Sequence, residues 1–137
     1  MLTQPLKYVL LWLLPFVASA DHVHWLGDYN IALQIAHKEH KPLLVLVVKK
    51  NSTLSNAIIK NIFMNQKYVE QINQKMVPVI VTYEGKLSYP IEMYYTRVFP
   101  TLFFVDSQRE LFINDPLYGE EITDKILEKY MREILLF

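Results

Sequence analysis

The sequence predicts a single α/β domain whose mixed central sheet of about four strands has helices on both faces. The first observation is the run Leu43–Val48, six apolar residues that suit a strand buried on both sides. The second is that helical patterns lie before and after this run, so that helices and strands alternate along the chain. The third is a pair of apolar runs joined by the polar turn Asp106–Arg109, which indicates a β-hairpin.

The expected elements follow one another in the order α-β-α-β-α-β-β-α. Helices are predicted over Tyr29–His40, Thr53–Phe63, Gln66–Asn73 and Glu120–Leu135, and strands over Leu43–Val48, Met76–Tyr83, Thr101–Val105 and Glu110–Ile113. A helical turn is expected to begin at Pro90 within the aromatic-rich segment Tyr89–Tyr95, because proline favours the first helical position. A β-α-β crossover followed by a hairpin makes the sheet mixed.

Local signals justify the bounds of the first elements. Asp28 is a suitable N-cap for the first helix, and Lys41–Pro42 ends that helix. The two middle helices have apolar residues at helical spacing. Ser52 or Thr53 can cap the first of them, at a gain of about 1 kcal/mol.

The later elements carry comparable signals. Met76–Tyr83 is rich in β-branched residues, and Pro78 lies near its start, where a missing N–H is tolerated. The last helix has an apolar stripe for the core. Glu120 and Glu121 would lie in its first turn, where the helix dipole favours acidic side chains.

Composition limits the class of protein. The chain has 137 residues, which fits one domain, and 52% of them are hydrophobic, enough for a core. Its 14 basic and 14 acidic residues give a formal charge of zero, and the sequence has no basic stripe. Nucleic acid is therefore not expected as a partner, because phosphate backbones are bound mainly by clustered lysine and arginine.

Residues 1–20 have the pattern of a secretory signal peptide. Lys7 provides a positive start, Tyr8–Val17 forms a short apolar block, and Ala18–Ala20 is a small-residue cleavage site. We expect cleavage before Asp21, which leaves residues 21–137 as the mature domain in the periplasm or outside the cell, with no membrane attachment. The alternative is an uncleaved signal anchor, although the apolar block is short for a bilayer span.

Four segments of the chain resemble one known family. They are Trp25 with Asp28–Leu33 and Lys41–Val45, the tetrad Ser52–Ser55, the strand Val77–Val81, and the segment Tyr95–Asp106. Together they are similar to exported bacterial thioredoxin-like proteins over about residues 25–135. The resemblance implies a thioredoxin fold, with the tetrad at the position of the family's C-x-x-C motif and Pro100 at the position of its cis-proline.

The tetrad departs from the family at both cysteines. Thiol–disulfide exchange needs a thiolate and proceeds through a mixed disulfide, and a serine hydroxyl can supply neither. The chain contains no cysteine at all, so oxidoreductase, isomerase and peroxidase activity through this site is excluded. A serine hydrolase is not supported either, since all four histidines precede the first strand and no G-x-S-x-G motif occurs. We therefore expect Ser52 or Thr53 to be a helix cap and the chain not to be an enzyme.

A peptide-binding groove does not need the missing sulfur. In the family, the backbone before the cis-proline pairs with an extended substrate peptide, and this recognition rests on main-chain hydrogen bonds. The expected wall of such a groove consists of Ser52, Thr53, Leu54, Val98, Phe99 and Pro100. The alternative is that Pro100 only shapes the entry into the following strand.

Two further features give alternative hypotheses. His22, His24, His37 and His40 are candidate ligands for Zn²⁺ or Cu²⁺, although surface histidines are the simpler interpretation and no cofactor is expected. The rings of Tyr89–Tyr95 could form an exposed interaction patch or fill the core under a loop. The leading hypothesis is a redox-inactive thioredoxin-like module in the periplasm that holds a peptide or a partner protein. The alternatives are a structural or assembly subunit with an aromatic surface, and a thiol-independent metal-binding protein.

Overall fold

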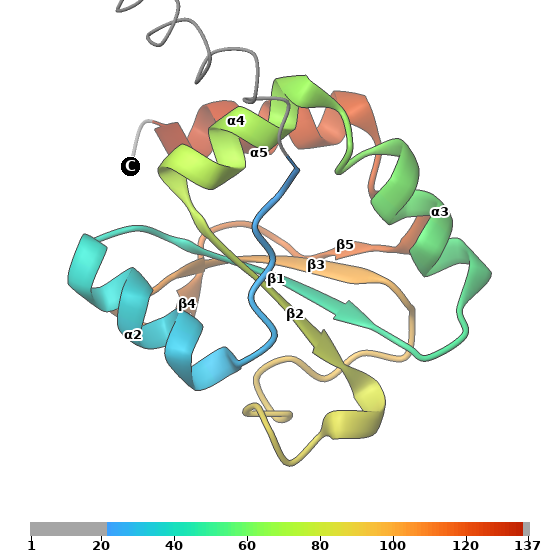
Figure 1. Ribbon diagram of the computed structural model, residues 1–137, viewed down its shortest axis with the longest axis horizontal. Helices are drawn as coiled ribbons and strands as arrows, with labels where there is room; N and C mark the ends of the chain where they lie inside the picture. The colour runs from blue at the N-terminus through green and yellow to red at the C-terminus, as the bar shows by residue number, and fades with distance from the viewer. Residues whose placement is uncertain (1–21, 136–137) are drawn as a thin grey trace, which may run out of the picture.

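A mixed β-sheet lies between two helical layers, with α2 on one face and α3, α4 and α5 on the other (Figure 1). The computed structural model describes residues 22–135, so the predicted signal peptide and its cleavage site lie outside the described residues. The helices are α2 (Tyr29–Glu39), α3 (Thr53–Asn61), α4 (Gln66–Lys75) and α5 (Asp124–Leu135), with 3-10 helices η1 (Tyr83–Gly85) and η2 (Gly119–Glu121). The strands are β1 (Leu43–Val48), β2 (Val77–Thr82), β3 (Thr101–Asp106), β4 (Leu111–Phe112) and β5 (Leu117–Tyr118).

The sheet confirms the predicted mixed architecture. The strand order is β2-β1-β3-β4, and β5 also pairs with β3. β1 runs parallel to β2, with Leu43 opposite Val77, and antiparallel to β3, with Val47 opposite Thr101. β1 is thus an interior strand that is buried on both faces, which is why its sequence is apolar without alternation.

The two cores follow from the alternation of side chains along the strands. Leu44, Leu46, Leu102 and Phe104 are completely buried on the face that α3, α4 and α5 cover. Neighbouring strand residues face α2 and the segment between η1 and β3, where a second core contains Leu43, Val45, Val47, Tyr29, Ala32, Ala36, Tyr89, Tyr94 and Phe103. Both faces of β1 and β3 are therefore closed to solvent by apolar packing.

Several local predictions are confirmed. Asp28 caps α2, since its side chain accepts a hydrogen bond from the N–H of Ile31 at 3.0 Å. Asp106 stabilises the turn after β3, because its Oδ1 accepts from the N–H of Gln108 at 3.0 Å. The turn at Pro90 is also present, since its carbonyl accepts from the N–H of Met93 at 3.1 Å.

The region after β4 differs from the prediction. The sequence pattern does not predict β5, which is two residues long and pairs with Thr101 and Leu102 of β3. The last helix begins at Asp124 and not at Glu120, because residues 119–121 form the separate 3-10 turn η2. The carboxylate of Glu121 accepts the N–H of Tyr118 at 2.9 Å and closes this turn. Within residues 22–135, no helix combines the length and the apolar character that a membrane span requires.

Candidate functional site

The sheet brings the serine tetrad and the proline segment to the same end of the molecule. β1 leads into the tetrad, which begins four residues after Val48. Because β3 is antiparallel to β1, its first residue, Thr101, pairs with Val47 near the end of β1. Pro100 directly precedes Thr101, so Ser52–Ser55 and Val98–Pro100 lie at the end of β1, as the sequence predicted.

Ser52 is the N-cap of α3, which confirms the capping prediction. Its Oγ accepts a hydrogen bond from the N–H of Ser55 at 3.1 Å. Thr53 is the first residue of the helix and is exposed. Neither serine hydroxyl is hydrogen-bonded to a histidine within residues 22–135.

Ser55 has a different environment from Ser52. It is 2% exposed, and its Oγ has no hydrogen-bond partner within the described part of the chain. An unpaired buried hydroxyl destabilises the folded state, so this serine is not optimised as a structural residue. Ser52 therefore stabilises the start of α3 through its cap, whereas the hydroxyl of Ser55 adds no hydrogen bond.

Replacement of Ser52 by alanine is expected to lower the free energy of unfolding by about 1 kcal/mol, because one N–H of the first turn of α3 loses its acceptor. Urea denaturation followed by circular dichroism measures this change. Ser52→Asp is the matched control, since aspartate caps helices as well as serine does. Equal destabilisation by both replacements would show that the cap is not the source of the effect.

The backbone before Pro100 is held by two buried threonines that sequence reasoning missed. The Phe99–Pro100 peptide bond is cis. The carbonyl oxygen of Val98 lies 3.0 Å from Thr96 Oγ1 and 2.5 Å from Thr101 Oγ1. Thr96 Oγ1 also accepts the N–H of Val98 at 3.1 Å, and the two hydroxyls are 2.8 Å apart. These contacts hold the backbone of Val98 through both its N–H and its C=O.

The backbone of Phe99 differs from that of its neighbours in its hydrogen bonding. The carbonyl of Pro100 accepts the N–H of Gly119 at 2.7 Å, so residues 98 and 100 both use their backbone within the fold. No hydrogen bond to the N–H or the C=O of Phe99 occurs among residues 22–135. Neither backbone group of Phe99 is therefore used in a hydrogen bond within the described residues.

Apolar side chains surround Phe99. Leu54 and Val98 are 37% and 45% exposed, and Phe99 is half-buried. The ring of Phe99 packs edge-on against Tyr83, with centroids 5.3 Å apart. We call Leu54, Tyr83, Val98 and Phe99 the Phe99 surface. Pro100 itself is buried, so the predicted wall is corrected on this point: the proline contributes backbone and no exposed side chain.

Gly119 joins the two sides of this surface. Its φ is +55°, and a Cβ at this position would lie 3.0 Å from Val98 Cγ1 and 3.8 Å from Leu54 Cδ2. Leu54 from α3 and Val98 from the proline segment therefore converge on η2. Glycine is required here for its backbone conformation and for the close approach of Val98. A Tyr-Gly pair before a helical pattern was the available signal, but it does not reveal this contact.

Charged side chains at this end of the sheet interact with backbone and aromatic groups. The N–H of Lys50 donates to Glu84 Oε1 at 3.0 Å, and this bond, with the charges of Lys49 and Lys50, holds the pKa of Glu84 below its ordinary value. Lys49 Nζ lies 5.9 Å from the centre of the Phe99 ring. Arg97 Nε donates to Tyr95 Oη at 3.1 Å, which raises the pKa of Arg97.

The aromatic segment divides between core and surface. Tyr94 is buried and shares a 2.8 Å hydrogen bond between hydroxyls with Tyr29, and burial raises the pKa of both phenols. Tyr89 is also buried. Tyr95 is 59% exposed and Leu87 is fully exposed. Most of the predicted patch therefore fills the second core, and a smaller part faces outward.

The four histidines form two separate pairs. His22 and His24 lie beside α4, where Asn73 Oδ1 accepts the N–H of His24 and Asn73 Nδ2 donates to the carbonyl of His22. His37 Nε2 contacts the carbonyl oxygen of Ser107, and His40 is the C-cap of α2. No group of three or more potential ligands from His, Cys, Asp and Glu is found among residues 22–135.

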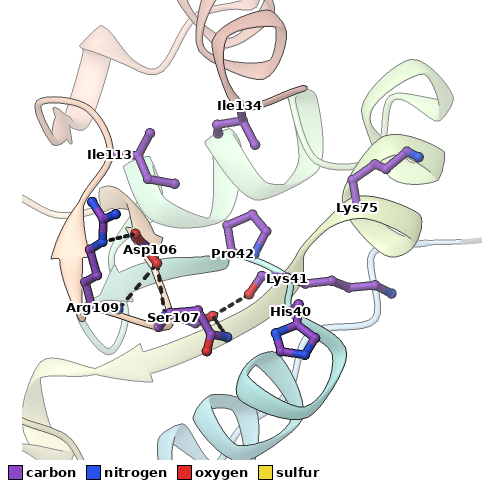
Figure 2. A pocket seen from close by; sticks show the side chains of 10 residues that line it. His40, Lys41, Pro42, Lys75, Asp106, Ser107, Arg109, Ile113 and Ile134 are labelled. Atoms are coloured by element: carbon purple, nitrogen blue, oxygen red, sulfur yellow. Dashed lines mark hydrogen bonds and ion pairs between the residues drawn. The ribbon is translucent and has the colours of Figure 1, made fainter. Parts of the chain in front are cut away.

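A pocket of about 460 Å³ lies at the opposite end of the sheet, where β1 begins and β3 ends (Figure 2). Its walls combine apolar side chains with charged ones: Pro42, Ile113 and Ile134, and His40, Lys41, Lys75, Asp106 and Arg109. Lys41 pairs with Glu39 at 3.6 Å and Arg109 with Asp106 at 3.9 Å. Lys41 and Lys75 extend to the side away from Arg109, so these cations do not converge on one ligand position.

Comparisons with known proteins agree with the fold. No family model and no curated protein sequence matches the chain. Solved structures do match. A structure described as DsbH oxidoreductase has a TM-score of 0.70 and 16% identity, over 87% of this chain and 89% of that one. A thioredoxin from Thermus thermophilus has a TM-score of 0.70 and 14% identity, over 84% and 88% of the two chains.

A putative disulphide-isomerase from Bacteroides thetaiotaomicron has a TM-score of 0.68 and 22% identity, over 85% of this chain and 97% of that one. These likenesses show a thioredoxin-like fold, which confirms the fold that the sequence resemblance implied. The chain thus has a thioredoxin-like fold, with serines where the resemblance places cysteines. Without a cysteine it cannot carry out thiol–disulfide exchange.

Proposed function

We propose that this chain is a redox-inactive, thioredoxin-like binding module that holds an extended peptide or a partner protein against the Phe99 surface. The site lies beside the Ser52–Ser55 tetrad. It works without covalent chemistry, so the chain acts as a binding protein and not as an enzyme. A fold by itself does not define a function, so the proposal rests on the backbone and the side chains of this sequence at that position.

The observation that carries the proposal is the unused backbone of Phe99. An extended peptide that adds to a protein through main-chain hydrogen bonds needs a free N–H and a free C=O, and side-chain contacts then select its sequence. Phe99 offers both groups between two residues whose backbone is fixed. Leu54 and Val98 provide exposed apolar area next to it.

We further propose that the protein acts after export, in the periplasm or an equivalent compartment. The support is the pattern of residues 1–20, which has a positive start, an apolar block and a small-residue cleavage site. An exported protein commonly uses disulfides for stability, and this chain contains no cysteine. Its stability therefore rests on the two apolar cores.

A structural or assembly subunit is the second candidate. The full exposure of Leu87 and the 59% exposure of Tyr95 favour it, because both are large side chains on the loop between β2 and β3. In that case the partner would bind the loop and would leave the Phe99 surface uncovered. The two candidates use different residues and can be separated.

Binding through the Phe99 surface predicts that Leu54→Asp and Phe99→Ala each weaken partner capture by at least about tenfold, the effect of removing a central contact. The measurement is capture of proteins from the exported fraction on immobilised residues 21–137, followed by affinities for the captured partner. Leu111→Asp is the matched control, since Leu111 is 59% exposed on β4. Capture that survives both changes but is lost with Tyr95→Ala would favour the assembly subunit.

A further inference from the structure

Charged residues of opposite sign lie next to different members of the Phe99 surface. Lys49 and Lys50 follow β1, and Lys49 Nζ lies 5.9 Å from the centre of the Phe99 ring. Glu120 and Glu121 belong to η2, whose Gly119 lies close to Val98 and Leu54. A bound segment would therefore meet the lysines where it passes Phe99, the positive side, and the glutamates where it passes Leu54 and Val98, the negative side.

The positive side is not neutralised by the fold. Lys49 and Lys50 are exposed, and neither ammonium group has a carboxylate oxygen within 4.0 Å in the described part of the chain. Glu84 is the nearby acid, and one of its oxygens is used by the backbone N–H of Lys50. The charges of the two lysines are thus opposed by one nearby carboxylate, and one oxygen of this carboxylate already accepts a backbone hydrogen bond.

The negative side is partly used within the fold. One carboxylate oxygen of Glu121 accepts the N–H of Tyr118, which ties this charge to the turn before α5. Glu120 is exposed beside it. An acidic group on this side would be repelled, while the lysine side would attract it.

We propose that the segment held at the Phe99 surface is acidic, with an apolar residue over Leu54 and Val98 and an aspartate or glutamate directed toward Lys49 and Lys50. This inference rests on the proposed function and adds the class and the orientation of its ligand. The cation–π contact keeps the ammonium of Lys49 beside the Phe99 ring, close to the chain that would pair with Phe99. Exposed charge pairs of this kind select the partner and its orientation more than they add affinity.

The test is a selection of random dodecapeptides displayed on phage against immobilised residues 21–137. The expected result is enrichment of peptides that contain an apolar residue next to aspartate or glutamate. A synthetic copy of an enriched peptide should bind roughly fivefold more weakly after its acidic residues are changed to asparagine or glutamine, as expected for two exposed charge pairs. High salt should reduce this difference.

Charge reversal identifies the lysines as the cause. The double change Lys49→Glu with Lys50→Glu should remove the preference for acidic peptides or invert it, while Lys125→Glu on the exposed part of α5 should leave it unchanged. Circular dichroism checks that each variant is folded. Enriched peptides without an acidic excess, or the same peptides after charge reversal, would overturn the inference and leave the binding function intact.

A different result would overturn the binding function itself. Peptides that are enriched equally on the wild type and on Leu54→Asp and Phe99→Ala variants would place binding elsewhere. No enrichment above uncoated support would mean that the surface does not hold peptides. Either result would overturn both the proposed binding function and the ligand class that depends on it.

Discussion

Replacement of Ser52 and Ser55 together by cysteine is expected to give this chain disulfide reductase activity. The two residues are neighbours at the start of α3, where the N–H of Ser55 donates to Ser52 Oγ at 3.1 Å. The first turn of α3 contains no acidic residue, so the partial positive charge of the helix N-terminus would stabilise a thiolate at position 52. The pKa of that thiol should fall below about 7.5, compared with about 8.5 for a free cysteine.

Two measurements check this expectation. Thiolate absorbance as a function of pH gives the pKa, and the reduction of insulin in the presence of dithiothreitol gives the activity. The buried position of Ser55 suits the second cysteine, since its hydroxyl has no partner to lose. Ser52→Cys alone is the control and should form mixed disulfides without turnover. A thiol pKa near 8.5 in the double variant would show that the N-terminus of α3 does not stabilise the thiolate as expected.

Replacement of Phe104 by alanine is expected to lower the free energy of unfolding by about 3–5 kcal/mol, which could unfold the domain outright. Phe104 is completely buried on β3 and packs edge-on against Tyr130 of α5, with ring centroids 5.4 Å apart. Its removal would leave a cavity between the sheet and the last helix. Urea denaturation followed by tryptophan fluorescence provides the measurement.

Phe112→Ala is the matched control for this change. Phe112 lies on the short edge strand β4 and is 40% exposed, although its ring is 5.1 Å from that of Phe103. Less apolar area is lost there, and solvent can fill the gap, so the cost should be less than half as large. Equal costs at the two positions would contradict the layered core described above.

Strong local patterns explain why most of the fold could be predicted from the sequence. Leu43–Val48 is apolar throughout because β1 is covered on both faces, and Asp28 and Ser52 are caps that act on their own helices. These signals are contained in a few neighbouring residues. The part that escaped prediction depends on distant partners: β5 is two residues long and exists because it pairs with β3.

The site was predicted in part for the same reason. Ser52–Ser55 and Val98–Pro100 were placed by their similarity to a known motif, and the structure brings them to one end of the sheet. The roles of Thr96, Thr101 and Gly119 could not be read from sequence, because each depends on contacts that form only after folding. The exposed charges of Lys49 and Lys50 indicate a ligand preference only after folding has placed Lys49 beside the ring of Phe99.

The segment before α2 also limits how this protein can associate with itself. Leu26 lies along the outer edge of β2, where its N–H donates to the carbonyl of Pro78 and its C=O accepts from the N–H of Ile80, both at 2.9 Å. Open strand edges promote aggregation because they pair with the edges of other chains. Leu26 therefore occupies two hydrogen-bonding groups of β2 that could otherwise pair with the edge of another chain, which makes the addition of a second sheet along this edge less favourable.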